Sequence, residues 1–459
     1  MLYVFLKTIM RIALRVFYKS FQVQHRERIP KSGPLLVVSN HPNTFMDPVI
    51  VGTTVRQPVY FLAMGSLFTS KFMTWFFTQL HMIPIQRKND TNKVKVDNRE
   101  VFKKCYDFLG KKGVVAIFPE GVSIKARRLQ PIKTGAARIA LGAEAEHNFE
   151  LGLQIMVVGL NYTRHDSFRS DVLVNIGETI LVKDFAGKYA ENQDHAIHEL
   201  TELIKQRIEN EVIITNSDAQ DSLASQIEMI YKPQLFADIP AQNIRDEEDF
   251  LISKAIVEAI QYFEEQDVER VKTFQPQIDG YMRDLKRLNL NDEVFSKSNR
   301  KSHLFSESIG LAFYFLIGFP FFLYGLLNNY IAYIIPSRIA ARIVRWTDTD
   351  EYTAPVMMTS GILTFSFFYA LQGWACHYFT QNIWIALAYL VTLPITGFFA
   401  LAYASVRRNS LDNWRLIALF YKRADLVSTL ITQRSALIKE LERAKEEYWA
   451  YLEREKNKN

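Results

Sequence analysis

The chain has 459 residues, and its 55 Lys and Arg against 49 Asp and Glu give a net charge of only +6. Apolar residues make up 48% of the sequence and aromatic residues 13%, which excludes wholesale disorder. Two cysteines, Cys105 and Cys376, are too few for a disulfide scaffold, a clustered-thiolate zinc site or a cysteine-held iron–sulfur cluster.

The charges are distributed unevenly along the chain. No Asp, Glu, Lys or Arg occurs between Glu307 and Arg338, and none occurs between Glu351 and Arg407. Charged residues are therefore concentrated before the first stretch and after the second. This segregation predicts a water-soluble module attached to a membrane rather than a soluble globular enzyme.

Residues 1–24 form the first predicted element. Lys7, Arg11, Arg15 and Lys19 interrupt the apolar run of a signal peptide and recur every four residues, which keeps them together on one helical face. A basic, aromatic-rich amphipathic helix is typical of the surface of an anionic membrane leaflet. The alternative is a helix packed on the enzyme core with solvated lysines.

Residues 25–210 alternate short β-rich runs with helical patterns such as 92–112 and 134–146. This alternation predicts an α/β domain with a mixed sheet flanked by helices. The predicted strands are bounded by Gly, Pro, Asn and Asp, and they are 35–40, 59–63, 114–118, 155–160 and 172–177.

Residues 211–306 are charged, poor in glycine and helical in pattern, so we expect a helical middle region. Residues 407–459 predict a cytoplasmic amphipathic helix, with Leu430, Leu437 and Leu441 along one side. Between them, residues 307–406 form the predicted membrane region.

Two spans are predicted in that region, at 355–375 and 383–405, because the uncharged stretch far exceeds the roughly 20 residues of one crossing. Trp374, Tyr378 and Trp384 surround the divide, where interfacial aromatic residues are expected. Two helices buried in a protein core are the alternative.

Residues 309–335 conflict with this scheme if they cross once, because the arginines at both ends of the spans would then lie outside. Gly318-Phe319-Pro320, Gly325 and Asn328-Asn329 interrupt the segment. We therefore expect a re-entrant or interfacial hairpin, with both ends of the chain cytoplasmic.

The chemistry concentrates where predicted strands end. His41 and Asp47 follow the first of them in NHPNTFMDP, and a histidine with a nearby carboxylate has the parts of a general base and its orienting partner. Such pairs also occur as simple hydrogen bonds. No serine elbow or Gly-rich phosphate loop accompanies His41, which disfavours a serine hydrolase or a nucleotide-binding fold.

Two further motifs follow. Arg87 comes after a short apolar strand in HMIPIQRKND, and Glu120 and Gly121 directly follow a buried-type strand in FPEGVSIKARRLQPIKTGAARIAL. The basic residues behind them are suited to a phosphate, although a solvated loop is the alternative reading of that cluster. They are Lys125, Arg127, Arg128 and Lys133.

Taken together, these motifs resemble the phospholipid/glycerol acyltransferase family over about residues 25–205. The order matches: a histidine–aspartate motif, an arginine motif, FPEG, and then an apolar strand, here IMVVGLNY. HPNTFMDP and the late hydrophobic segments are most similar to the branch with the fungal glycerol-3-phosphate/dihydroxyacetone-phosphate acyltransferases.

The resemblance implies roles for six residues. His41 would be the base with Asp47 as its partner, Arg87 would contact the acceptor phosphate, and Glu120, Gly121 and Lys133 would belong to the acceptor site. Three departures stand out. Five residues instead of the usual four separate His41 from Asp47, His81 and Pro84 replace a glycine and an aromatic, and Val157-Val158-Gly159 lacks the usual proline.

The resemblance further implies transfer of an acyl group from acyl-CoA or acyl carrier protein to a glycerophosphate, next to membrane lipids. No metal, organic cofactor or nucleic-acid partner is expected. The branch resemblance favours glycerol-3-phosphate as the acceptor, in phosphatidic acid and phospholipid synthesis, while 1-acylglycerol-3-phosphate and dihydroxyacetone phosphate stay open as alternatives. Two other classes also stay open, a non-catalytic membrane scaffold with the same fold and a transporter with a soluble appendage; the uncharged spans disfavour the latter.

Overall fold

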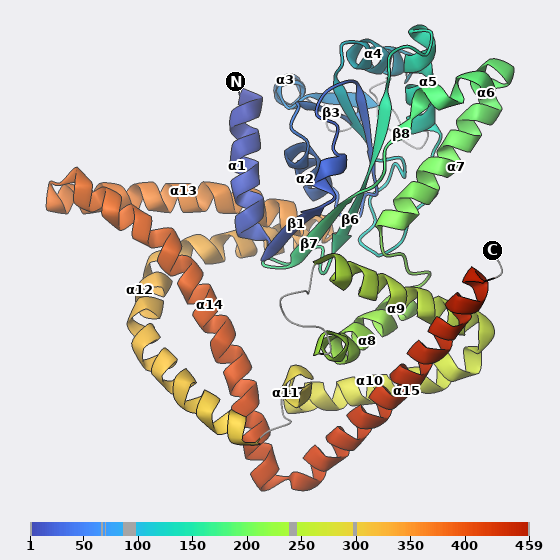
Figure 1. Cartoon of the computed structure of the whole chain (residues 1–459). Coiled ribbons are helices and arrows are strands. Elements are labelled where there is room, and N and C mark those ends of the chain that lie inside the picture. The colour runs from blue at the N-terminus through green and yellow to red at the C-terminus, as the bar shows by residue number, and fades with distance from the viewer. Residues whose placement is uncertain are drawn as a thin grey trace. The chain divides into compact units, whose positions relative to one another are not determined.

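The structure of the chain, a computed structural model, describes residues 2–65, 68, 70–85, 98–237, 246–296 and 301–457 (Figure 1). The chain forms two compact units. The first contains residues 1–214 and 336–362, and the second contains residues 215–335 and 363–459.

The first unit contains a mixed sheet of eight strands in the order β1-β7-β6-β2-β5-β3-β4, with β8 paired to β6. The centre of the sheet is parallel from β6 to β4, whereas β7 and β8 are antiparallel to β6. The strands are β1 (Ser20–Gln24), β2 (Leu35–Ser39), β3 (Val59–Met64), β4 (Met82–Ile85), β5 (Val114–Ile117), β6 (Gln154–Tyr162), β7 (Asp171–Ile176) and β8 (Ile180–Leu181).

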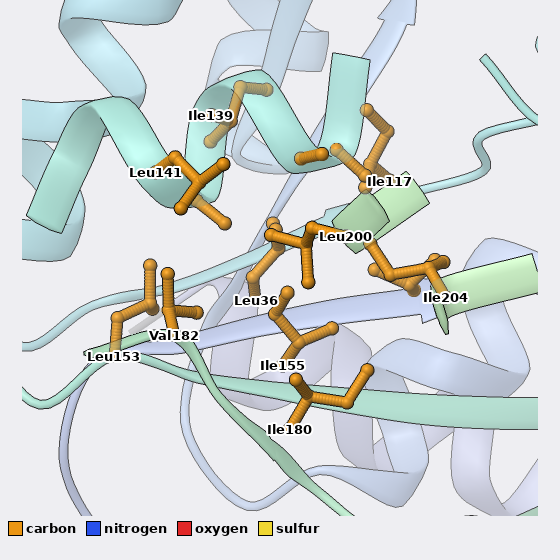
Figure 2. Close-up of a cluster of buried hydrophobic side chains, with 14 of the residues drawn as sticks. Leu36, Ile117, Ile139, Leu141, Leu153, Ile155, Ile180, Val182, Leu200 and Ile204 are labelled. Atoms are coloured by element: carbon orange, nitrogen blue, oxygen red, sulfur yellow. The ribbon is translucent and has the colours of Figure 1, made fainter. Parts of the chain in front are cut away.

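Helices cover both faces of this sheet. They are α1 (Leu2–Phe17), α2 (Met46–Thr54), α3 (Lys71–Gln79), α4 (Asn98–Gly110), α5 (Gly135–Glu146), α6 (Ala186–Glu191) and α7 (Gln193–Glu211), with 3₁₀ turns at Arg26–Arg28 and Val182–Phe185. Successive strand residues point to opposite faces. Leu36 and Ile155 accordingly pack against α5 and α7 (Figure 2), whereas Leu35 and Met156 belong to a second cluster with α1 and α2.

The α/β fold and its mixed sheet are confirmed. All five predicted strands form, with ends shifted by at most two residues from the predicted ranges. The short strands β1 and β8 were not predicted, because SFQVQ carries two glutamines and Ile180–Leu181 is only two residues long. Tertiary pairing with β7 and β6, and not local pattern, makes these segments strands.

Helix α1 packs on α2 through its basic side. Lys7 Nζ donates hydrogen bonds to the backbone oxygens of Val55, Arg56 and Gln57 at 2.6, 3.1 and 3.0 Å, and Arg11 Nε donates to Thr53 O at 3.0 Å. These are carbonyls at the C-terminal end of α2, where cations are favourable. Burial lowers the pKa of Lys7 to about 8. The exposed side chains of α1 include both apolar and basic ones: Val4, Phe5, Ile12 and Val16 are exposed, and so are Arg11 and Arg15.

Helices are the only regular secondary structure among the described residues of the second unit. Its helices are α8 (Asp218–Ala237), α9 (Asp246–Gln266), α10 (Val268–Leu288), α11 (Glu293–Ser296), α14 (Ile383–Lys422) and α15 (Ala424–Lys456), together with most of α12 (Lys301–Thr347) and α13 (Thr353–Thr380). Leu430, Leu437 and Leu441 are buried on α15, as the sequence pattern predicts. Arg434 on the same side forms a buried ion pair with Asp292, with the Nε–Oδ1 distance at 2.8 Å.

Three helices of the described chain are long and apolar enough to cross a membrane. These segments are Phe313–Thr347, Thr353–Thr380 and Ile383–Arg408. Large apolar side chains such as Leu316, Phe367 and Val391 are exposed on them, which suits contact with lipid. The chain is therefore a membrane protein by the length and composition of these helices.

The break expected within 309–335 is not formed, because α12 is one continuous helix of 47 residues (Figure 1). The asparagines that were read as an interruption join helices instead. Asn328 Oδ1 accepts from Tyr389 OH at 2.6 Å, and Asn329 Oδ1 accepts from Tyr369 OH at 2.7 Å. Gly325 lies where a Cβ would be 2.2 Å from the backbone oxygen of Thr396. Small and polar residues of this kind pack helices together in an apolar bundle.

Candidate active site

His41 and Asp47 are in contact at the end of β2. The distance from His41 Nδ1 to Asp47 Oδ2 is 2.8 Å, and the Asp47 side chain is fully buried. Asp47 is the second residue of α2, where the helix dipole favours a carboxylate. A carboxylate that accepts from Nδ1–H leaves the Nε2 lone pair of His41 free to take a proton.

A turn absorbs the extra residue between His41 and Asp47. The backbone oxygen of Asn43 accepts from the amides of Met46 and Asp47 at 2.8 and 3.2 Å, so α2 begins only at Met46. The Asn43 amide in turn donates to Asp47 Oδ2 at 2.7 Å. The later helix start brings the carboxylate back to the imidazole despite the longer spacing.

Glu120 lies beside the dyad, because β5 is the parallel neighbour of β2 and both strands end at the same edge. Glu120 Oε1 accepts from the His41 amide at 2.7 Å, and Oε2 accepts from the Gln130 amide at 2.8 Å. The residue is only 4% exposed. Burial raises the pKa of Glu120, and these two hydrogen bonds oppose that shift. Both carboxylate oxygens of Glu120 thus accept hydrogen bonds from backbone amides.

Gly121 and Lys133 lie together behind Glu120. Gly121 has φ of +70°, a conformation that favours glycine, and a Cβ there would be 2.4 Å from Lys133 Nζ. The Lys133 amide donates to Pro119 O at 3.0 Å, which fixes the start of this side chain. The Lys133 side chain therefore packs over Gly121, with its ammonium group beside the FPEG turn.

The His41 ring also has a defined orientation. It stacks on Phe118 with ring centroids 4.2 Å apart and an angle of 17° between the planes. Phe118 precedes Pro119 at the end of β5. Stacking on one face and the hydrogen bond at Nδ1 together restrict rotation of the imidazole, whose side chain is 11% exposed.

Five of the six predicted site residues lie at this edge of the sheet. They are His41, Asp47, Glu120, Gly121 and Lys133. The sixth, Arg87, is outside the described residues.

Sequence reasoning missed three residues that hold the site. Tyr162 OH donates to Asp47 Oδ1 at 2.5 Å, and Ser123 Oγ accepts from the Thr44 amide at 2.9 Å. Asn43 Nδ2 donates to His165 O at 2.5 Å. The only sequence signal for Tyr162 is a hydroxyl at the end of the buried run QIMVVGLNY. Because Tyr162 is far from Asp47 along the chain, the sequence does not indicate that the two residues are in contact.

The connection between α12 and α13 also contacts this unit. Lys125 Nζ donates to Asp350 O at 2.5 Å, and the rings of Phe45 and Tyr352 have centroids 6.0 Å apart. Ala354 and Met358, in the first turns of α13, are buried in the same cluster as α1 and α2. The start of an apolar helix is therefore built into the unit that carries His41.

The family model for acyltransferases matches residues 20–162, which includes the dyad and the FPEG turn. This segment is an acyltransferase-family domain. Glycerol-3-phosphate O-acyltransferase 1 of Saccharomyces cerevisiae is 27% identical over 228 residues, 49% of this chain and 28% of the yeast protein. Glycerol-3-phosphate O-acyltransferase 2 of the same yeast is 36% identical over 127 residues, 28% of this chain and 17% of that protein.

A plant relative also matches the acyltransferase domain. The chloroplastic 1-acyl-sn-glycerol-3-phosphate acyltransferase BAT2 of Brassica napus is 30% identical over 130 residues, 28% of this chain and 36% of the plant protein. The chain thus spans little more than a third, at most, of these three relatives. The crystal structure of PlsC, the 1-acyl-sn-glycerophosphate acyltransferase from Thermotoga maritima, matches with 19% identity and a TM-score of 0.32, covering 45% of this chain and 79% of PlsC.

Proposed function

We propose that the chain transfers a fatty acyl group from an acyl thioester to a hydroxyl group of glycerol-3-phosphate, as a step of phosphatidic acid and phospholipid synthesis. The observation that carries the proposal is the His41–Asp47 hydrogen bond within an acyltransferase-family domain. The assembled dyad favours an enzyme over a non-catalytic scaffold with the same fold.

In the proposed reaction, His41 Nε2 takes the proton of the acceptor hydroxyl as its oxygen attacks the thioester carbonyl. Asp47 keeps the imidazole in the required tautomer and stabilises the imidazolium. When the tetrahedral intermediate collapses, the C–S bond breaks and the leaving thiolate receives the proton from His41. No acyl-enzyme is needed, because the thioester is already activated.

The acceptor would bind beside the FPEG turn. Lys133 and Arg87 are proposed to contact its phosphate, and Gly121 is proposed to allow its close approach. Glu120 enters this proposal differently from the sequence-based one, since both of its carboxylate oxygens already accept from backbone amides. Its proposed role is to hold the loops around His41.

The yeast relatives favour glycerol-3-phosphate as acceptor, by their names, and the plant relative favours 1-acylglycerol-3-phosphate as the second candidate. Purified protein should be incubated with labelled oleoyl-CoA and, in turn, glycerol-3-phosphate, dihydroxyacetone phosphate and 1-acylglycerol-3-phosphate. We expect labelled monoacyl product from the first. Label only with the third would establish the second candidate, and no label with any acceptor would overturn both.

We further propose that the acyltransferase domain faces the cytoplasm, where acyl thioesters are made. The exposed apolar and basic side chains of α1 support contact of this domain with the membrane surface. The contacts of Lys125 with Asp350, and of Met358 with the domain core, support placing the end of α12 and the start of α13 on the same side.

The start of α12 is proposed to lie on that side too, since the charged sequence 211–306 offers no span. Contacts within the second unit support a path in which α12 enters the membrane and leaves it on the same side. Residues 318, 325 and 329 of α12 meet residues 399, 396 and 393 of α14, approaching the α13–α14 turn. Residues 328, 329 and 332 then meet residues 372, 369 and 364 of α13, leading away from that turn.

Single-cysteine labelling tests this arrangement in a variant that lacks Cys105 and Cys376. An impermeant reagent added outside intact cells should label a cysteine at Thr380, next to the α13–α14 turn, and spare one at Thr347. Labelling at Thr347 from outside would contradict the proposed path of α12.

A further inference from the structure

Asp47 accepts three hydrogen bonds although it is completely buried. His41 Nδ1 and the Asn43 amide share Oδ2, whereas Oδ1 accepts from the Tyr162 hydroxyl alone. A buried carboxylate is costly unless its oxygens are hydrogen-bonded. Among the described residues, Tyr162 is the one whose side chain donates a hydrogen bond to Asp47 Oδ1.

Tyr162 is itself fixed in position. It ends β6, which pairs with β2 on one side and β7 on the other, and its side chain is 5% exposed. Burial and the nearby Asp47 raise the pKa of Tyr162 well above its usual range. The hydroxyl therefore keeps its proton near neutral pH and acts as a donor to the carboxylate.

A second buried tyrosine, Tyr18, packs against Tyr162. Tyr18 follows the last residue of α1, is 1% exposed, and has its ring centroid 6.1 Å from that of Tyr162. Burial also raises the pKa of Tyr18. Asp47 contributes to the raised pKa of Tyr18, so the Tyr18 ring packs beside both Tyr162 and the carboxylate and restricts movement of the Tyr162 ring.

We propose that Tyr162 is a positioning residue for the acyl transfer proposed above, holding Asp47 so that Oδ2 stays directed at His41 Nδ1. The inference rests on that proposed function. Tyr162 neither touches substrate nor loses its proton, and its effect passes through Asp47. Without its hydroxyl, Oδ1 has no side-chain donor, and rotation of the carboxylate would weaken the contact with the imidazole.

A purely structural role predicts something different. If Tyr162 only stabilises the buried sheet edge, removing its hydroxyl would lower stability and affect every variant alike. If it acts through Asp47, its removal should matter only while Asp47 is present, because residues that work as a unit are not additive.

The test is a double-mutant cycle with Tyr162→Phe and Asp47→Ala in the full-length protein, using labelled oleoyl-CoA and glycerol-3-phosphate. Tyr162→Phe alone should lower kcat by about 10-fold, the effect of leaving one buried acceptor unpaired, with both KM values within about twofold. In the Asp47→Ala background, the same change should alter kcat by less than about twofold.

Tyr106→Phe is the matched control, because it removes a hydroxyl whose hydrogen bond goes to Arg138 O, at a site distant from the dyad. It should leave kcat unchanged. Equal losses from Tyr162→Phe in both backgrounds, or wild-type kcat in the single variant, would overturn the positioning role while acyl transfer by the wild type stands. Absence of transfer by the wild type would overturn the proposed function itself.

Discussion

In the acyltransferase unit, buried polar side chains lie where strands end and hold a histidine, whereas in α12–α14 they lie within helices and join one helix to the next. Asp47 and Glu120 bind backbone amides and the His41 ring. Asn328 and Asn329 bind tyrosines of neighbouring helices. The same residue types serve chemistry at the edge of a sheet and cohesion in an apolar bundle.

Among the residues that support His41, the largest effect should come from changing Asp47. Asp47→Asn places an amide where the carboxylate accepts from Nδ1, which favours the wrong imidazole tautomer. We expect kcat for acyl transfer to fall by at least about 100-fold, and the free energy of unfolding to fall by about 1–3 kcal/mol, because one of the buried donors to Asp47 loses its acceptor. Loss of folding in parallel with activity would reduce Asp47 to a structural residue.

The family resemblance predicts that Glu120 contacts the acceptor, whereas in the structure both of its carboxylate oxygens accept hydrogen bonds from backbone amides. Glu120→Gln can accept with only one of its two terminal atoms, so the amide of His41 or Gln130 loses its partner. We expect kcat to fall about 10-fold and the free energy of unfolding to fall by about 1–3 kcal/mol.

A control variant and the acceptor KM separate the possible roles of Glu120. The exposed Glu146→Gln should change neither quantity. A rise in the acceptor KM with kcat and stability unchanged would favour direct contact with the acceptor instead.

In the helical unit, Gly325→Leu should separate α12 from α14, because a Cβ there meets the backbone oxygen of Thr396. Overpacking of this kind costs about 1–3 kcal/mol, so the unfolding midpoint in detergent should fall by several degrees. Gly310→Leu is the matched control, since a Cβ at Gly310 meets no atom within 4 Å. Equal midpoints for the two variants would break the proposed role of the Gly325 contact.

Lys133→Ala should give the smallest of these effects. If its ammonium contacts the acceptor phosphate, the KM for glycerol-3-phosphate should rise about 2- to 10-fold, as for loss of an exposed or partly exposed charge contact. The KM for oleoyl-CoA should stay unchanged. A rise in the donor KM alone would assign Lys133 to the phosphates of the donor.

Much of the first unit could be predicted because its signals are local. Apolar runs bounded by turn residues gave the strands, and motif order brought His41, Glu120 and Gly121 to one edge. Tyr162 could not be found this way, since 115 residues separate it from Asp47 and only strand pairing brings them together. The hydrogen bonds of Glu120 were equally hidden, because burial and not residue type decides them.

The structure of the helical unit was harder to predict from the sequence, because residues that usually indicate turns also occur inside apolar helices. Glycine, proline and asparagine end helices in water, where their backbone can bind solvent. In α12 the Asn328 and Asn329 side chains form hydrogen bonds with neighbouring helices instead, and the helix continues. The sequence shows that these residues are polar, but it does not show which residues of neighbouring helices form hydrogen bonds with them.

The most direct test of the account compares wild type and His41→Ala in transfer of labelled oleate from oleoyl-CoA to glycerol-3-phosphate. Expression and thermal unfolding should be nearly the same for both. We predict robust transfer by the wild type and a loss of about 10²- to 10⁴-fold in the variant. Retention of more than about a tenth of the activity by a folded His41→Ala protein would contradict His41 as the base.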